Sequence, residues 1–426
     1  MAAGSASPLP DDPPGIVDRK AEHIRINLEE DVAAKGVTTG FERYRFVHRA
    51  LPEIDLESVS LQTSFLGRRL DAPLLFSCMT GGTARARQIN RTLAAAAQRH
   101  RVAMGLGSCR VLLEHPEVLA TFAVRDLCPD VPLLANLGAV QLNLGVGTAA
   151  CRRIVDVLEA DALVLHLNPL QEALQPEGDT RFAGLFRRIE ALCAALEIPV
   201  IVKEVGWGIA PDLVAALFDA GVAAVDVAGA GGTSWSEVER HRIADPVRAR
   251  VAAAFADWGL PTADAIRLAR EAAPRGTLIA SGGIRGGVEV AMAIALGADL
   301  AGSAGSMLRA ADLGEEALDA AVDEITDTLR IAMFCAGARD VGSLFRDARL
   351  LSRAAGGAGT PELLTGARPA PRGRPRGGPP SSHRGSPSLA GAAEPRSAHP
   401  AMDAARQSRA RLTPPQHSAA GGAATP

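Results

Sequence analysis

Apolar residues along the chain gather in short runs, and each run is followed by a segment in which apolar positions recur every three or four residues. Most runs end in a small or polar residue, as a strand does where it leaves a sheet. The alternation predicts strands that are each followed by a helix. Eight strands are predicted, at Pro73–Ser77, Val102–Leu106, Pro132–Ala135, Ala162–Leu167, Pro199–Lys203, Ala223–Val227, Thr277–Ala280 and Asp299–Gly302.

Two of the intervening segments carry the clearest helical signals. The segment Arg181–Leu196 is predicted to be a helix, because its apolar positions fall on one face at spacings of three and four: Phe182, Leu185, Ile189, Leu192 and Leu196. In the next predicted helix, Pro211 suits the first turn, Leu213 and Leu217 supply an apolar face, and Gly221 fits the position just past the end.

Eight strand–helix units over roughly 260 residues predict a (β/α)8 TIM barrel, a fold whose sites lie at the carboxyl ends of the strands. A doubly wound parallel sheet is the main alternative. Hydrophobic residues make up 47% of the chain and aromatic residues only 4%, a composition suited to helices packed closely on strands. The segment Trp235–Asp257, rich in Glu and Arg, is expected to be an insertion that shapes or covers the site.

Composition divides the chain into three parts. Residues 1–16 form a lead rich in Pro and Asp that is expected to be flexible, and residues 17–354 form the predicted barrel domain. Residues 355–426 are rich in Pro, Gly, Ala and Arg and predict a disordered, dispensable tail. The net charge is −3, and because the tail is basic the rest of the chain is acidic, so no nucleic-acid partner is expected.

The cysteines and the N-terminus bear on location. Six cysteines are scattered without a CxxC pair or zinc spacing, which predicts free thiols in a reducing compartment. The first residues lack the basic and apolar regions of a signal peptide, and no apolar run reaches the roughly 18 residues of a membrane span. We therefore expect a cytoplasmic protein without a membrane partner.

Polar side chains crowd the end of the fourth predicted strand. His166 and Asn168 share one face of the strand, and Pro169 ends it because proline cannot donate to a sheet. Gln171 and Glu172 are then expected in the loop beyond. An amide offers donors and acceptors, and a carboxylate binds Mg²⁺. The alternative is an ordinary polar loop beside a hydrogen-bonded core histidine.

Four strand ends are rich in glycine, which lets backbone N–H groups approach phosphate oxygens closely. Two of them follow the last two strands, where TIM barrels commonly bind phosphate. Together they predict a phosphorylated ligand, although glycines also serve tight turns. They are Met79–Thr83, Gly229–Ser234, Ser281–Arg285 and Gly302–Gly305.

Basic side chains occur at two further places. Lys203 ends an apolar strand, where an unpaired ammonium is costly to bury, so it is expected to face an anion or a polarised carbonyl. Pairing with Glu204 is the alternative, but adjacent strand residues point to opposite faces. Arg19, Lys20 and His23 lie in a charged cluster that is either solvated surface or an arm that closes over an anion.

An ordered set of motifs over residues 17–335 resembles the type 2 isopentenyl-diphosphate delta-isomerases, an FMN-dependent family. The set is Arg19-Lys20 with His23, Met79–Gly82, Gly107-Ser108, Ala135–Gly138, His166–Asn168 with Gln171-Glu172, Lys203–Gly206, Gly231–Trp235, Trp258–Thr262 and Ser281–Arg285. That family interconverts isopentenyl and dimethylallyl diphosphate in isoprenoid biosynthesis. The resemblance implies FMN, Mg²⁺ and NADPH as cofactors, a prenyl diphosphate as partner, and a homo-oligomer.

The resemblance also implies roles for individual residues. Arg19 and Lys20 would bind the substrate diphosphate and Glu172 would bind Mg²⁺. Gln171 would contact the substrate, and with His166 and His23 it is a catalytic candidate. The residues implied for FMN are Met79, Thr80, Gly81, Ser108, Asn136, Lys203, Thr233, Gly282, Gly283, Arg285, Ala304 and Gly305.

The chain departs from the family pattern at two positions. Cys109 stands where Gln is usual and is expected beside flavin and substrate, and Met292 stands where Lys is common. Two other functions stay open. A barrel oxidoreductase of the hydroxy-acid oxidase or dihydroorotate dehydrogenase type would use FMN, but it gives no reason for the Arg19-Lys20 pair. A binding protein without turnover would not need Gln171 and Glu172.

Overall fold

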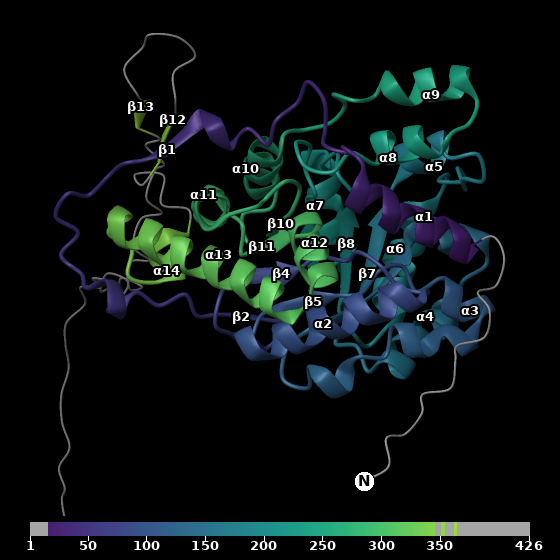
Figure 1. The fold of residues 1–426 in the computed structure, drawn as a ribbon, viewed down its shortest axis with the longest axis horizontal. Coiled ribbons are helices and arrows are strands. Elements are labelled where there is room, and N and C mark those ends of the chain that lie inside the picture. The colour runs from purple at the N-terminus through teal and green to yellow at the C-terminus, as the bar shows by residue number, and fades with distance from the viewer. Residues whose placement is uncertain (1–15, 346–350, 354–361, 364–426) are drawn as a thin grey trace, which may run out of the picture. The chain divides into compact units, whose positions relative to one another are not determined.

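The computed structural model describes residues 16–345, 351–353 and 362–363 (Figure 1). Within that part, eight parallel strands form a closed barrel in which each strand pairs with the next and the last pairs with the first. Closure confirms the predicted (β/α)8 TIM barrel and excludes the doubly wound sheet, which has open edges. The strands are β4 (Leu74–Phe76), β5 (Ala103–Gly105), β6 (Leu133–Gly138), β7 (Ala162–Leu167), β8 (Val200–Glu204), β9 (Ala224–Asp226), β10 (Thr277–Ala280) and β11 (Leu300–Ser303).

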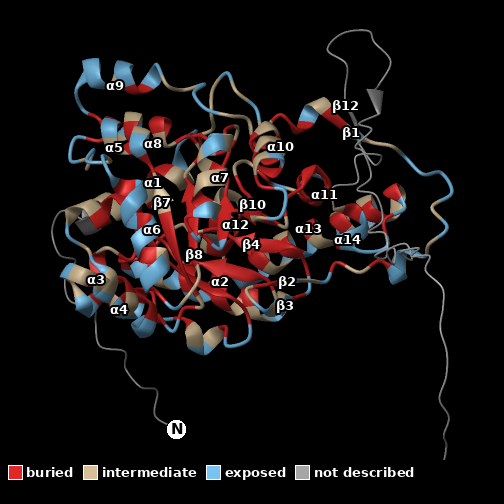
Figure 2. Ribbon diagram, turned by 180° about the vertical axis from the view of Figure 1, so that it is seen from behind, coloured by how far each residue is buried: buried red, intermediate tan, exposed pale blue. Residues whose placement is uncertain are grey.

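Helices surround the barrel with their apolar faces on the strands. Figure 2 shows the barrel strands buried and the outer faces of the helices exposed. The helices of this layer are α2 (Ala84–His100), α4 (Thr148–Leu158), α6 (Leu185–Ala195), α7 (Pro211–Asp219), α10 (Thr262–Ala272), α11 (Gly287–Leu296), α12 (Gly305–Leu313) and α13 (Glu315–Ala336), with the short α3 (Val111–Glu114) and α14 (Val341–Leu344) beside them.

The predicted helix boundaries hold at α7 and shift at α6. Pro211 lies in the first turn of α7, and Gly221 takes a left-handed φ of +89° just past its end. Helix α6 begins at Leu185 rather than Arg181, because Gly184 is left-handed at φ +74° and interrupts the helical backbone before that point. Strand β6 runs on to Gly138, since its pairing with β7 continues past the predicted end.

The inside of the barrel changes from apolar to polar along the strands. Leu134, Val164 and Ile201 belong to the apolar cluster inside the barrel. Two residues further on, on the same face, come Asn136, His166 and Lys203. The apolar layer is closed by a hairpin that the sequence did not predict, β2 (Thr63–Phe65) and β3 (Arg68–Leu70), whose Phe65 and Leu70 join the same cluster. Polar groups therefore lie at the carboxyl ends.

Helices from three parts of the chain meet over those ends. They are α1 (Ile16–Glu29), α5 (Pro169–Leu174) and α8 (Trp235–Arg242), and α8 packs against both of the others and against α9 (Pro246–Ala253). The expected insertion Trp235–Asp257 thus forms α8 and α9. Gln171 and Glu172 were expected in a loop, which is wrong: Pro169 ends the strand but occupies the first turn of α5, where its fixed φ favours a helix.

A small sheet extends the chain beyond the predicted domain boundary at residue 354. Strand β1 (Tyr44–Phe46) pairs with β12 (Leu351–Arg353), which pairs with β13 (Glu362–Leu363). The rest of the predicted tail, and the predicted lead apart from Ile16, lie outside the described residues. Among the described helices, none is long and apolar enough to cross a membrane.

Candidate active site

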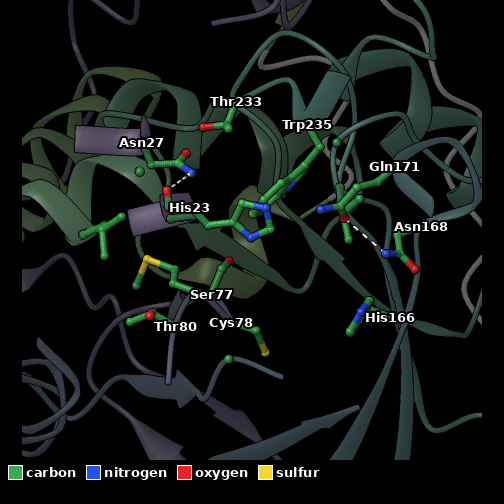
Figure 3. Close-up of a pocket in the computed structure, with 18 of the residues that line it drawn as sticks. His23, Asn27, Ser77, Cys78, Thr80, His166, Asn168, Gln171, Thr233 and Trp235 are labelled. Carbon is green, nitrogen blue, oxygen red and sulfur yellow. Dashed lines mark hydrogen bonds between the residues drawn. The ribbon is translucent and has the colours of Figure 1, made fainter. Parts of the chain in front are cut away.

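A cavity of about 440 Å³ lies between the carboxyl ends of the strands and the elements α1, α5 and α8. Every residue predicted for the site lines it, although the individual roles remain predictions. These residues are Arg19, Lys20, His23, Met79, Thr80, Gly81, Ser108, Asn136, His166, Gln171, Glu172, Lys203, Thr233, Gly282, Gly283, Arg285, Ala304 and Gly305. Figure 3 shows how several of them converge. Residues that lie far apart in the chain, from α1 to α12, therefore line one cavity, as expected for the strand ends of a barrel.

The glycine-rich loops after β9 and β10 touch each other through their backbones. A Cβ on Gly232 would lie 2.3 Å from the backbone nitrogen of Gly283, and one on Gly283 would lie 2.5 Å from Thr39 Cγ2. Gly283 is also left-handed, at φ +76°. Beside these loops the N-terminus of α12 begins at Gly305, which lines the cavity. Closely approached backbone N–H groups and a helix N-terminus suit the phosphate of FMN.

Lys203 presents its ammonium to the cavity. Its Nζ donates to the backbone carbonyl of Glu204 (2.6 Å), which leaves further protons for a ligand. The Glu204 carboxylate is not its partner, because it accepts from the backbone N–H groups of Val205, Gly206 and Trp207. Burial raises the pKa of Glu204 to about 7. A cation in this position suits an electron-rich flavin ring.

Ser77 adds a second sign that a polar ligand fits. Its Oγ is buried, lines the cavity region and has no hydrogen-bond partner among the described residues. Buried hydroxyls are normally hydrogen-bonded, so this group is expected to meet a bound molecule. The lysine, the orphan hydroxyl and the glycine loops together fit FMN.

His166 is held as a neutral ring. Its Nδ1 lies 2.8 Å from Asn136 Oδ1, and because an amide oxygen only accepts, Nδ1 is the donor. Burial lowers the pKa of His166 to about 3, and the charges of Lys203 and Lys20 act in the same direction. The imidazole therefore serves as a neutral hydrogen-bonding group at neutral pH rather than as a general acid.

Gln171 is oriented by two neighbours. Asn168 Nδ2 donates to Gln171 Oε1 (3.1 Å), and Gln171 Nε2 donates to Glu239 Oε1 (2.9 Å). The same Glu239 oxygen lies 3.2 Å from His23 Nε2, and Figure 3 shows the His23 ring beside Trp235, at an edge-on centroid distance of 5.1 Å. Burial would raise the pKa of Glu239, but these hydrogen bonds and a nearby arginine lower it. Glu239 is thus the anionic anchor of this network.

Glu172 lines the cavity close to this network. Its Oε1 accepts from Asn168 Nδ2 (2.8 Å), and its Oε2 accepts from Gln175 Nε2 (2.6 Å) and the backbone of Asp179 (2.7 Å). Among the described residues no group of three metal-ligating side chains occurs. Mg²⁺ typically takes one or two carboxylates together with water and substrate phosphates, so a single oriented carboxylate with a lone pair left on Oε1 fits it.

Arg19 and Lys20 reach the cavity from α1. Lys20 Nζ donates to the backbone carbonyl of Ser108 (2.8 Å) and lies 5.1 Å from the centre of the Phe122 ring. Burial lowers the pKa of Lys20 to about 8. Arg19 is only weakly engaged, 4.0 Å from Glu177. The charged cluster of the sequence is therefore a cationic arm facing the cavity rather than solvated surface.

Comparisons with known proteins identify the family. Isopentenyl-diphosphate delta-isomerase of Synechococcus sp. is 57% identical over 331 residues, which cover 78% of this chain and 95% of that protein. The enzyme of the same name from Nostoc sp. is 52% identical, covering 76% and 93%. The chain belongs to the isopentenyl-diphosphate delta-isomerase family. The FMN-dependent dehydrogenase family also matches, at residues 17–114 and 166–351, which supports FMN as the cofactor.

Solved structures agree with the fold of this isomerase-family chain. A flavocytochrome b2 variant with pyruvate bound gives a TM-score of 0.56 at 17% identity, covering 77% of this chain and 82% of that one. A mandelate oxidase variant gives 0.52 at 18% identity, covering 78% and 96%. At such low identity the likeness shows the barrel alone.

The two departures from the family pattern lie outside the cavity lining. Cys109 was expected beside flavin and substrate, but it is fully buried and does not line the cavity, and its Sγ donates to the carbonyl of Gly107 (3.3 Å). Met292 is buried in the apolar face of α11. Neither side chain touches the cavity in the isomerase-family site.

Sequence reasoning missed three residues of the site. Ser77 reads as an ordinary strand end, and Trp235 was noted only as part of a motif. Glu239 lies in Trp235–Arg242, a helix rich in charged residues that reads as solvated surface. Its spacing of four from Trp235 places both on one helix face, and that spacing was the available signal.

Proposed function

We propose that this protein interconverts isopentenyl and dimethylallyl diphosphate in isoprenoid biosynthesis, with FMN, Mg²⁺ and NADPH as cofactors. The observation that carries the proposal is that residues expected to bind FMN and residues expected to bind a diphosphate substrate line the same cavity. The FMN set includes Lys203 and the glycine loops, and the substrate set includes Arg19, Lys20 and Gln171. Curated relatives named for this reaction share 47–57% identity with the chain.

The reaction moves a double bond, so one carbon gains a proton and another loses one, with no net oxidation. Reduced FMN, when bound, supplies acid/base capacity at its ring, and NADPH is the proposed source of the reducing electrons. The side chains near it are poor acids for an alkene. His166 is neutral, and Glu239 is held ionised by its partners.

The chain's own residues bind and orient the substrate. Arg19 and Lys20 bind the diphosphate, and Glu172 holds Mg²⁺, which neutralises diphosphate charge. Asn168 and Glu239 fix the orientation of Gln171. Its amide contacts the part of the substrate in which the double bond moves, and it positions the reacting carbons. Lys203 balances negative charge on the flavin side of the cavity.

The oxidoreductase alternative is not favoured. Its support is the fold likeness to oxidases and dehydrogenases, which says nothing about substrate at 17–18% identity. It also leaves the cationic arm of Arg19 and Lys20 without a role.

The six free cysteines agree with action in the reducing cytoplasm, and a homo-oligomer remains our prediction from the resemblance.

The proposal is tested by following product by NMR with purified protein, FMN, NADPH, Mg²⁺ and isopentenyl diphosphate under anaerobic conditions. Dimethylallyl diphosphate is expected in the complete mixture, and its formation is expected to stop without reductant or with a chelator. Glu172→Gln is expected to raise the Mg²⁺ concentration needed for half-maximal rate. A flavin-loaded protein that gives no product in the complete mixture overturns the proposal.

A further inference from the structure

Arg242, the last residue of α8, binds three carboxylates at once. Its Nε lies 3.1 Å from Glu22 Oε2, its Nη2 lies 2.8 Å from Glu177 Oε1, and its Nη1 lies 2.6 Å from Glu239 Oε2. Glu22 belongs to α1, Glu177 follows α5, and Glu239 belongs to α8 itself. The Arg242 side chain is only 10% exposed. One guanidinium therefore links α1, the segment after α5 and α8, which lie over the cavity.

The pair with the fully buried Glu239 is stronger than an ordinary surface ion pair, whereas Glu22 and Glu177 are about half exposed and contribute less. A guanidinium offers five donors in a fixed plane, so it can serve several carboxylates with little loss of freedom. Without it, three carboxylates would face one another, and the fully buried Glu239 would lose a charged partner. Removing one partner of a buried charge pair is strongly destabilising, because the other charge stays buried without compensation.

Glu239 divides its two oxygens between this arginine and the site. Oε2 accepts a hydrogen bond from Arg242 Nη1, whereas Oε1 accepts one from Gln171 Nε2 and also lies within hydrogen-bond distance of His23 Nε2. Fixing one oxygen fixes the direction of the other. The orientation of Gln171 thus depends, through Glu239, on a residue that does not line the cavity.

We infer that Arg242 is a positioning residue for the diphosphate and the alkene of the substrate. Through its carboxylate partners it acts as a latch: it holds α1 over the cavity, and it orients Glu239 towards Gln171. The inference rests on the proposed function for its substrate. It also concerns Arg19, which lies 4.0 Å from Glu177, the carboxylate that Arg242 holds at 2.8 Å. Both arginines face the same Glu177 oxygen, and because the shorter contact is to Arg242, Arg19 is held only weakly and stays available for a diphosphate.

The latch predicts a specific kinetic pattern for Arg242→Gln. Freed Glu177 will pair with Arg19 and compete with the substrate, so KM is expected to rise by about tenfold or more, equivalent to about 1.4 kcal/mol. The value of kcat is expected to fall as Gln171 loses its orientation. Adding Glu177→Gln removes the competitor, so the double variant is expected to recover most of KM but not kcat. Arg242→Lys, a point charge, is expected to rescue only in part.

Arg240→Gln is the matched control. Arg240 lies on the same helix and pairs with Glu237 of that helix; the arginine is 38% exposed and the carboxylate is buried. Arg240→Gln is therefore also the loss of one partner of a buried carboxylate, but neither residue lines the cavity, so KM, kcat and FMN affinity are expected to stay unchanged within about twofold. Equal effects of Arg240→Gln and Arg242→Gln would overturn the latch.

Binding of inorganic diphosphate, measured by calorimetry on the FMN-loaded protein with Mg²⁺, separates this inference from the proposed function. Wild type without isomerase activity would reject the function, while a diphosphate affinity that falls about tenfold in Arg242→Gln would still support the latch. Unchanged diphosphate affinity, KM and kcat would overturn it. If Arg242→Gln fails to fold, Glu22→Gln, which cuts only the tie to α1, decides through the same KM and affinity measurements.

Discussion

His166 and Lys20 both line the cavity, and burial pushes both towards their neutral forms. For His166 the shift is complete at neutral pH, since its pKa is about 3. For Lys20 the pKa of about 8 keeps the amine mostly protonated at neutral pH but close to titration. The cation that we propose for the diphosphate is therefore sensitive to mildly alkaline pH, whereas the histidine is not sensitive to mildly acidic pH.

Substrate affinity is expected to fall as pH rises through the pKa of Lys20. If, as proposed, the protonated amine binds the diphosphate, the KM is expected to rise about tenfold between pH 7 and pH 9, as the charged fraction falls. Lys20→Arg keeps its charge over this range and is expected to flatten the profile. Steady-state rates at several pH values provide the measurement. A wild-type profile as flat as that of the arginine variant would argue against Lys20 as a diphosphate ligand.

The elements of the barrel were predictable because their signals are local. Each strand is an apolar run, and α7 begins with Pro211 and ends before Gly221. The errors have local causes too: Pro169 serves both as a strand end and as a helix start. The spacing from Trp235 was the only local signal for Glu239, and its partners were not predictable, because only the packing of α8 on α1 and α5 brings it into contact with His23 and Gln171. The cavity itself was located correctly because strand ends of a barrel always converge.

The loops after β9 and β10 are expected to tolerate no side chain where they cross. Gly283→Ala adds a Cβ 2.5 Å from Thr39 and 2.9 Å from the Gly231 carbonyl, in a left-handed conformation. We expect it to weaken FMN binding by about tenfold, equivalent to about 1.4 kcal/mol. Gly286→Ala is the control, since its Cβ meets nothing within 4 Å and its φ is −143°. Flavin fluorescence titration measures both, and equal FMN affinities would contradict the assignment.

At the scale of the whole molecule, the described residues that line the cavity all lie between Arg19 and Arg309. The described part of the chain continues to β13, which ends at Leu363. Truncation after Leu363 is therefore expected to leave kcat/KM and the unfolding midpoint unchanged within error, whereas truncation before Leu351 removes β12 and β13 and is expected to lower the midpoint. Thermal unfolding and the isomerase assay compare the two. Lost activity in the longer truncated form would show that residues 364–426 contribute to function.

The proposed function requires that the flavin act without net oxidation or reduction. It is tested by mixing fully reduced, FMN-loaded protein anaerobically with isopentenyl diphosphate and Mg²⁺, and following dimethylallyl diphosphate and the flavin spectrum together. Many product molecules are expected for each flavin while the spectrum stays that of the reduced form. Flavin oxidation in step with substrate consumption, or no product beyond one molecule for each flavin, would contradict it.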